Sequence, residues 1–163
     1  MFIKVLPLFL ALGLFLGNGS SPADFEYIGS AKCKSCHNSA AKGAQYKVWA
    51  AGPHAKAFES LKGDEAKDPK CLKCHTTMGH TDKNLHYSLT QEEGVGCESC
   101  HGPGSAYKTP AVMRSQEKSI AKGLIIPDEK LCRSCHNEES PDFKGFDYKE
   151  YLKKMEHSRP ADD

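Results

Sequence analysis

Apolar residues are scarce in this 163-residue chain once its first 23 residues are set aside. Leu, Ile and Val are thinly spread beyond residue 24, and Trp49 is the only tryptophan. The remaining chain of about 140 residues is a single-domain length, but it has little material for an ordinary hydrophobic core. Something other than side chains is therefore expected to fill the interior.

Long hydrophobic runs are missing too, apart from one near the start. That run covers residues 5–16, follows Lys4 and gives way to small and polar residues, which is typical of a secretory signal peptide. It is shorter than the roughly 20 apolar residues of a membrane-spanning helix, although a retained N-terminal anchor is the alternative. We expect a signal peptide at 1–23, cleaved after Gly19 or Ala23. A single domain at 24–163, without a membrane span and located in the periplasm or outside the cell, would follow.

A surplus of either charge is absent as well. Residues 24–163 contain 21 Lys and Arg against 21 Asp and Glu. Proteins that bind nucleic acids usually carry a basic surplus, so no nucleic-acid partner is expected.

The chain is rich, by contrast, in one repeated cysteine pattern. Four Cys-x-x-Cys pairs are each followed directly by a histidine, in CKSCH, CLKCH, CESCH and CRSCH, which we call motifs 1 to 4. The paired cysteines are Cys33, Cys36, Cys71, Cys74, Cys97, Cys100, Cys132 and Cys135, and the histidines are His37, His75, His101 and His136.

Three kinds of chemistry use paired cysteines. Four disulfides would suit an exported protein, and zinc would use two pairs per ion, but neither explains a histidine after every pair. Covalent haem c explains it, since Cys-x-x-Cys-His is its attachment pattern. Two thiols on one side of a helical turn reach the vinyl groups of one porphyrin, and the histidine binds the iron as proximal ligand.

The sequence therefore predicts four covalently bound haem c groups. Intervals of 38, 26 and 35 residues between the first cysteines of the motifs are unequal, which excludes a solenoid of fixed period. So short a chain must pack its haems closely, and their propionates should make the neutral polypeptide acidic. We expect a mainly α tetrahaem cytochrome with much irregular chain, organised around closely packed haems.

Each iron can take a second axial ligand from elsewhere in the chain. Four histidines lie outside the motifs and are the candidate distal ligands: His54, His80, His86 and His157. Methionine is the weaker alternative, from Met78, Met113 or Met155, because Met usually packs as filler. Two strong ligands restrict an iron to electron transfer, whereas an open position allows small-molecule chemistry.

Local patterns predict a few elements. A helix is expected over 39–49, a break at Gly52-Pro53 and a helical turn over 54–61. Loops are expected over 62–70 and 102–116, with a possible hairpin across 87–89. Pro127 followed by two acidic residues should open a helix into motif 4. Residues 147–157 show one apolar helical face that ends at His157.

Several of these stretches resemble the cytochrome c-554 family. They are CKSCHNSAAKGAQYKVW with HAKAFESL, CLKCHTT, GVGCESCHGPGS and CRSCHN, and the resemblance covers about residues 27–140. It implies a mostly helical tetrahaem fold with haems stacked in pairs and an activity of electron carriage. It also implies proximal roles for the four motif histidines and distal roles for His54 and His157. Tyr107 stands where many members carry a histidine, and we expect it only to pack or to hydrogen bond.

Three functions remain open at this point. The first is an electron carrier with mostly bis-histidine haems that exchanges electrons with donor and acceptor proteins. The second is an enzyme with one open iron that reduces nitrogen oxides or hydroxylamine, which needs a distal acid–base group. The third is a self-associating subunit of an extracellular haem polymer, in which a histidine serves the neighbouring chain's haem.

Overall fold

The computed structural model describes residues 25–157 and is mainly helical, so the expected signal peptide lies outside the described residues. The α-helices are α1 (Ser30–His37), α2 (Gln45–Ala51), α3 (Pro69–His75), α4 (Thr77–His80), α5 (Cys97–His101), α6 (Pro110–Met113), α7 (Gln116–Ala121), α8 (Glu129–Arg133) and α9 (Tyr148–Met155). The 3-10 helices are η2 (Ala40–Lys42), η3 (His54–Lys56), η4 (Phe58–Ser60), η5 (Gly63–Lys67) and η6 (Lys83–Leu85). The predicted class, mainly α with much irregular chain, is confirmed. Within the described range no helix is long and apolar enough to cross a membrane.

Short helices replace several of the longer predicted segments. The helix expected over 39–49 is divided into η2 and α2 at Gly43 and Ala44, whose φ angles are 92° and 50°. These left-handed conformations stop a right-handed helix from continuing. The break at Gly52 and the helical turns after it are confirmed as predicted, and the final helix is confirmed as α9.

Three predictions for the loops need correction. Residues 62–70 contain η5 and the first turn of α3, and residues 102–116 contain α6. No hairpin forms across 87–89, and the described residues hold only an isolated parallel bridge between Tyr27 and His86. In that bridge Tyr27 N donates to Leu85 O at 2.8 Å, and Tyr87 N donates to Tyr27 O at 3.0 Å. The segment after η6 therefore pairs with the start of the domain and not with itself.

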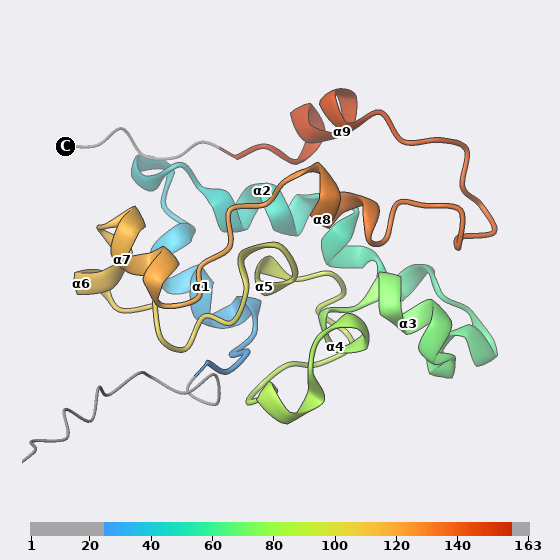
Figure 1. Cartoon of the computed structure of the whole chain (residues 1–163), viewed down its shortest axis with the longest axis horizontal. Coiled ribbons are helices and arrows are strands. Elements are labelled where there is room, and N and C mark those ends of the chain that lie inside the picture. Colours follow the sequence, from blue (N-terminus) through green and yellow to red (C-terminus); the bar gives the residue numbers. More distant parts are fainter. Residues whose placement is uncertain (1–24, 158–163) are drawn as a thin grey trace, which may run out of the picture.

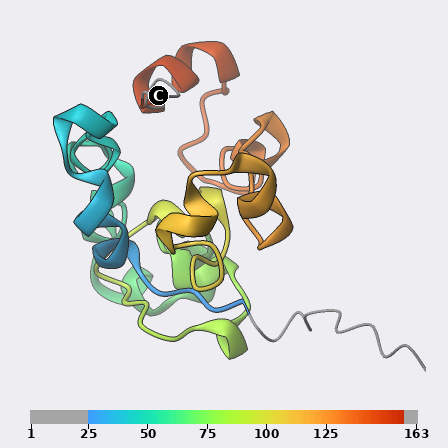
Figure 2. The same cartoon turned by 90° about the vertical axis from the view of Figure 1, so that its left-hand side faces the viewer.

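The helices that carry motifs 1 and 3, α1 and α5, contact each other. Figure 1 shows α5 near the middle, α1 on one side of it, and α8 and α3 on the other. The long loop that follows α8 returns as α9, which runs along one edge of the molecule in both views (Figures 1 and 2). Motif-bearing helices that are far apart in the sequence therefore lie around α5, in the middle of the molecule (Figure 1).

The interior is small and largely polar. Among the described residues only Ile28 and Tyr107 are buried hydrophobic side chains, at 4% and 6% exposure. The buried polar side chains are Ser30, Thr76, Thr77, Glu98, Ser99 and Ser119. The shortage of apolar residues in the sequence is thus matched by a shortage of apolar core in the structure.

Glu98 is the most connected of these buried groups. Its carboxylate accepts hydrogen bonds from the backbone amides of Ile28 (3.0 Å), Gly29 (2.7 Å) and Gly104 (2.6 Å). A Cβ at residue 104 would lie 2.9 Å from the carboxylate, so only glycine allows this approach. Glu98, inside motif 3, thereby joins the start of the domain to the Gly-Pro-Gly turn.

Hydroxyl groups extend this polar junction to the helix that carries motif 1. Ser30 N donates to Glu93 Oε2 at 3.0 Å, and the Ser30 hydroxyl accepts from Cys97 N at 3.0 Å. The Thr77 hydroxyl accepts from Gly96 N at 2.8 Å. These side chains accept backbone N–H groups at the starts of neighbouring helices and so hold the starts of α1, α4 and α5 together. Buried backbone N–H groups need such acceptors.

Replacing Glu98 with Ala should destabilise the protein strongly. Three buried amides would lose a charged acceptor, and hydrogen bonds to charged groups contribute roughly 1.5–3 kcal/mol each, so we expect a loss of about 5 kcal/mol or more. Urea unfolding of the haem-loaded protein, followed by far-UV circular dichroism, measures it. Glu92→Ala, at an exposed neighbouring position, should change the stability by less than about 0.5 kcal/mol. Equal midpoints for the two variants would contradict this role.

Candidate functional site

The four motifs lie on short helical turns. α1, α3 and α5 contain motifs 1, 2 and 3 entirely, whereas α8 ends at Arg133 and motif 4 finishes just beyond it. Acidic N-caps begin two of these helices: Asp68 accepts from Lys70 N at 2.8 Å and Asp128 from Leu131 N at 2.9 Å. All eight cysteines belong to the described range, and all are free thiols. The helical turn places both sulfurs of a motif on one side, as attachment to one porphyrin requires.

Thiols of different motifs are neighbours. The Cys33 thiol is a neighbour of the Cys97 thiol, and their interaction raises the pKa of Cys33 and lowers that of Cys97. Burial, together with the nearby Cys135, raises the pKa of Cys74 to about 11. Motif 1 therefore adjoins motif 3, and motif 2 adjoins motif 4.

The two pairs of motifs are joined through Cys100. Burial, followed by the influence of Cys132 and Cys135, raises the pKa of Cys100 to about 11. Motif 3 thus also lies beside motif 4. These three adjacencies order the motifs 1–3–4–2, the same order in which α1, α5, α8 and α3 follow one another in Figure 1.

Hydrogen bonds orient three of the four motif histidines. His75 Nδ1 lies 2.8 Å from Ala57 O, His101 Nδ1 lies 3.2 Å from Ile125 O, and His37 Nδ1 lies 3.3 Å from Gln45 Oε1. A carbonyl oxygen only accepts, so each Nδ1 carries the proton and leaves the Nε2 lone pair available. This arrangement is typical of metal-binding histidines, whose other ring nitrogen is held by an outer partner.

Two motif histidines face candidate distal histidines. The ring centroids of His54 and His136 are 5.9 Å apart, and those of His101 and His157 are also 5.9 Å apart. Two imidazoles bound on opposite sides of one metal ion have centroids about 6 Å apart, since each metal–nitrogen bond is about 2 Å. His54 belongs to η3 and His157 follows α9, so each pair brings together segments that are remote in sequence.

Burial favours the neutral imidazole in all four of these rings. It is the main cause of the lowered pKa of His54, His136, His101 and His157. Neighbouring imidazoles lower the pKa of His54 and His101 further. Metal binding requires the neutral ring, so the electrostatics and the geometry agree.

The remaining pair, His80 and His86, differ in their hydrogen bonds. His80 Nδ1 lies 3.0 Å from Thr76 O, which leaves its Nε2 lone pair available. His86 Nε2 lies 2.8 Å from the Thr81 hydroxyl, which donates its own proton to Thr77 O at 2.7 Å. His86 Nε2 must therefore carry a proton and donate to Thr81. Of the two, only His80 presents its Nε2 as a ligand.

Tyr107 contributes to structure beside motif 3. Its hydroxyl donates to Gly102 O at 2.9 Å and to His101 O at 3.1 Å. Burial raises its pKa, so the phenol keeps its proton. The expectation that Tyr107 packs and hydrogen bonds is confirmed.

Two aromatic residues lie beside motif 4: Tyr151, on the predicted apolar face of the last helix, and Phe146, which the sequence analysis did not single out. Phe146 stacks on His136 with centroids 4.7 Å apart and an interplanar angle of 14°, and Tyr151 lies 5.8 Å from His136. A cavity of about 270 Å³ adjoins them, lined by Cys135, His136, Phe143, Lys144 and Tyr151 among others. The amphipathic pattern of the last helix predicts the apolar position of Tyr151. Phe146 precedes that helix, so the pattern does not include it.

These features fit haem c better than a bare metal ion. The described range holds no group of three or more His, Cys, Asp or Glu side chains arranged to bind a metal ion. It does hold free thiols on helical turns, neutral histidines with available Nε2 atoms, and an interior with few apolar side chains. A covalently attached porphyrin would use all of them.

Comparison with known proteins gives the same answer. A profile of the family described as "Cytochrome c554 and c-prime" matches residues 32–102. Cytochrome c-554 of Nitrosomonas europaea is 33% identical over 171 residues, which covers 83% of this chain and 69% of that protein. No solved structure matches the chain. The chain therefore belongs to the cytochrome c-554 family, and it is a c-type cytochrome that binds haem c covalently and carries electrons.

Proposed function

We propose that this protein is an exported electron carrier with four haem c groups, most of them ligated by two histidines. The haems are attached at motifs 1 to 4, and we number them accordingly. The proximal ligands are His37, His75, His101 and His136. The count of four rests on the four complete attachment motifs in the sequence.

The observation that carries the proposal is the facing of imidazoles at 5.9 Å in two separate places. On this basis we assign His54 to the iron of haem 4, opposite His136, and His157 to the iron of haem 3, opposite His101. We assign His80 as a third distal ligand because its Nε2 lone pair is available, whereas His86 donates to Thr81. Irons closed on both sides transfer electrons and do not bind substrate.

The contacts between thiols support a continuous electron route. From these contacts we infer the haem order 1–3–4–2, in which haem 3 neighbours haem 1, haem 4 neighbours haem 2, and haems 3 and 4 neighbour each other. The protein groups position the haems, keep their histidines neutral and exclude water from part of their surface, while each haem supplies the one-electron chemistry. Electrons would enter at one haem and leave at another, toward donor and acceptor proteins.

Export agrees with this chemistry. The opening stretch of the sequence has the pattern of a signal peptide, and haem c is attached outside the cytoplasm. We therefore place the protein in the periplasm or outside the cell.

A second candidate function is a haem enzyme with one open iron. The observation that favours it is the engagement of His86 Nε2 with Thr81, which leaves three distal histidines with an available Nε2 for four irons. A reductase of nitrogen oxides or hydroxylamine would use the open position. The same vacancy would suit a haem polymer in which a histidine from another copy completes the site.

Purified protein should carry four haems. Its mass should exceed that of the processed polypeptide by four haem groups, and Cys132→Ala with Cys135→Ala should reduce the gain to three. Denaturing mass spectrometry and the absorbance of the pyridine complex give the count independently. Any count other than four in the unaltered protein refutes the tetrahaem assignment.

His54→Ala should convert one haem in four from low spin to high spin, because haem 4 loses its distal ligand while its attachment through Cys132 and Cys135 is kept. Electron paramagnetic resonance of the oxidised protein measures the high-spin fraction. His157→Ala should convert a different haem, so that the double variant shows two. A spectrum unchanged by His54→Ala would exclude His54 as a ligand.

His80→Ala and His86→Ala should differ, although both remove an imidazole from the same stretch of chain. The first should add one high-spin haem, and the second should leave the haem spectrum as it was, since His86 is bonded to Thr81. If His86→Ala added the high-spin haem and His80→Ala did not, the assignment would be reversed. Concentrating the unaltered protein distinguishes the polymer, whose high-spin haem would become low-spin on association.

A further inference from the structure

Basic side chains gather on the elements around motif 1. α1, η2 and the segment 108–122, which contains α6 and α7, lie at the same end of the molecule in Figures 1 and 2. We call these elements the basic end. They contain a single acidic residue, Glu117. Their basic residues are Lys32, Lys34, Lys42, Lys108, Arg114, Lys118 and Lys122.

These charges are exposed and lack acidic partners within residues 25–157. All seven basic side chains are exposed. The salt bridges of the described range all lie elsewhere, between Lys73 and Glu139, Arg133 and Glu129, and Lys153 and Glu150. Lys34 lies over the ring of Tyr46, with its ammonium group 5.6 Å from the ring centroid. The ring attracts the ammonium group but carries no negative charge to neutralise it.

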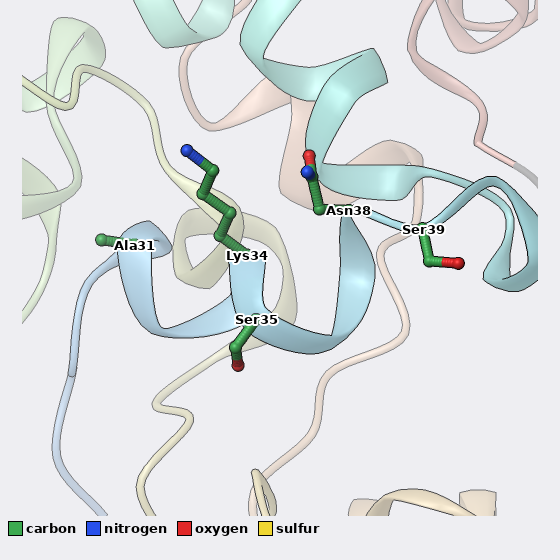
Figure 3. Close-up of a pocket in the computed structure, with 5 residues that line it drawn as sticks. All are labelled: Ala31, Lys34, Ser35, Asn38 and Ser39. Carbon is green, nitrogen blue, oxygen red and sulfur yellow. The ribbon is translucent and has the colours of Figure 1, made fainter.

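The surface of this end is hollowed beside motif 1. A shallow, open depression of about 570 Å³ is lined by Ala31, Lys34, Ser35, Asn38 and Ser39. Figure 3 shows these side chains on the turns of α1 and just after it, with Lys34 and Asn38 on one side and Ser35 on the other. The ammonium group of Lys34 and the amide of Asn38, which point to the same side, suit the carboxylate of another molecule.

We propose that the basic end is the docking surface for an acidic redox protein, and that electrons pass between that partner and haem 1. The proposal rests on the proposed function, since it requires a haem at motif 1. Cys36, one of the two attachment thiols of this haem, is exposed, so the cofactor edge lies close to the same surface. Haem 1 is also one terminus of the order 1–3–4–2, which suits an entry or exit point.

A separate acidic protein fits this surface better than a second copy of the chain. A second copy would have to offer its segment 138–150, which contains five acidic and two basic side chains, because residues 59–73 at the opposite end contain four of each. The surplus of three negative charges in that segment is only half of the positive surplus of the basic end. Charged surfaces that complement each other accelerate encounter and are weakened by salt. The propionates of haem 1 would neutralise only part of a surplus of six positive charges.

Reduction by an acidic redox protein provides the test. The haem-loaded protein is mixed with reduced plant-type ferredoxin, an acidic donor of low potential, and the haem absorbance is followed by stopped flow. Electrostatic steering predicts that the second-order rate falls about tenfold or more from low to physiological ionic strength. Lys42→Glu with Lys118→Glu should slow the reaction about tenfold at low ionic strength, and both sites lie outside the haem motifs.

A variant of equal net charge serves as the control. Lys67→Glu with Lys70→Glu changes exposed residues of η5 and α3 at the other end, and should slow the reaction less than about twofold. Equal slowing by both variants, or a rate that ignores salt, overturns the docking site. A change in haem reduction potential without any slowing also overturns the docking site, because the lysines would then interact only with the haem propionates.

Self-association and the proposed function are checked separately. If the protein forms dimers at low salt, by sedimentation, and Lys42→Glu with Lys118→Glu abolishes them, the occupant is a second copy and the proposal is wrong. Full reduction of four haems by excess dithionite tests the electron carrier itself. Failure there would refute the proposed function, whereas normal reduction with no ferredoxin effect would refute only the docking surface.

Discussion

The burial of one carboxylate constrains much of this structure. Glu98 is 2% exposed and accepts backbone amides from residues 28, 29 and 104. A buried charge is tolerated only when such donors surround it, so the three segments must meet where Glu98 lies. Because Glu98 belongs to motif 3, between its two cysteines, this contact also determines where that motif lies relative to the start of α1.

The polar junction explains how a chain with so few apolar residues forms a specific fold. Ser30, Thr77 and Glu93 accept amides from the first turns of neighbouring helices, so each short helix begins at a defined place. Helices of four to eight residues have little stability of their own. Fixed starting points and covalently attached cofactors would together replace the long packed helix faces of an ordinary α-helical domain.

Sites defined by a strict spacing of residues could be predicted from the sequence. Geometry that depends on contacts between residues far apart in the sequence could not. The motifs, the apolar face of α9 and the role of Tyr107 follow from local patterns. The division of the first predicted helix depends on left-handed backbone at Gly43 and Ala44. Alanine rarely adopts this conformation, so its presence at residue 44 does not predict the break. Nothing in the sequence ranks His80 above His86, because the difference lies in one hydroxyl proton, donated by Thr81 to Thr77.

Glu98 and the proposed electron route meet at the same contact. The thiols of Cys33 and Cys97 adjoin each other beside the carboxylate that holds residues 28 and 29. Those residues begin the turn into α1, so the position of haem 1 relative to haem 3 would be set by backbone amides on Glu98 and by Ser30 on Cys97. Electron transfer between haems depends steeply on their separation. The polar junction at this point would therefore link the stability of the fold to the proposed passage of electrons from the basic end into the row of haems.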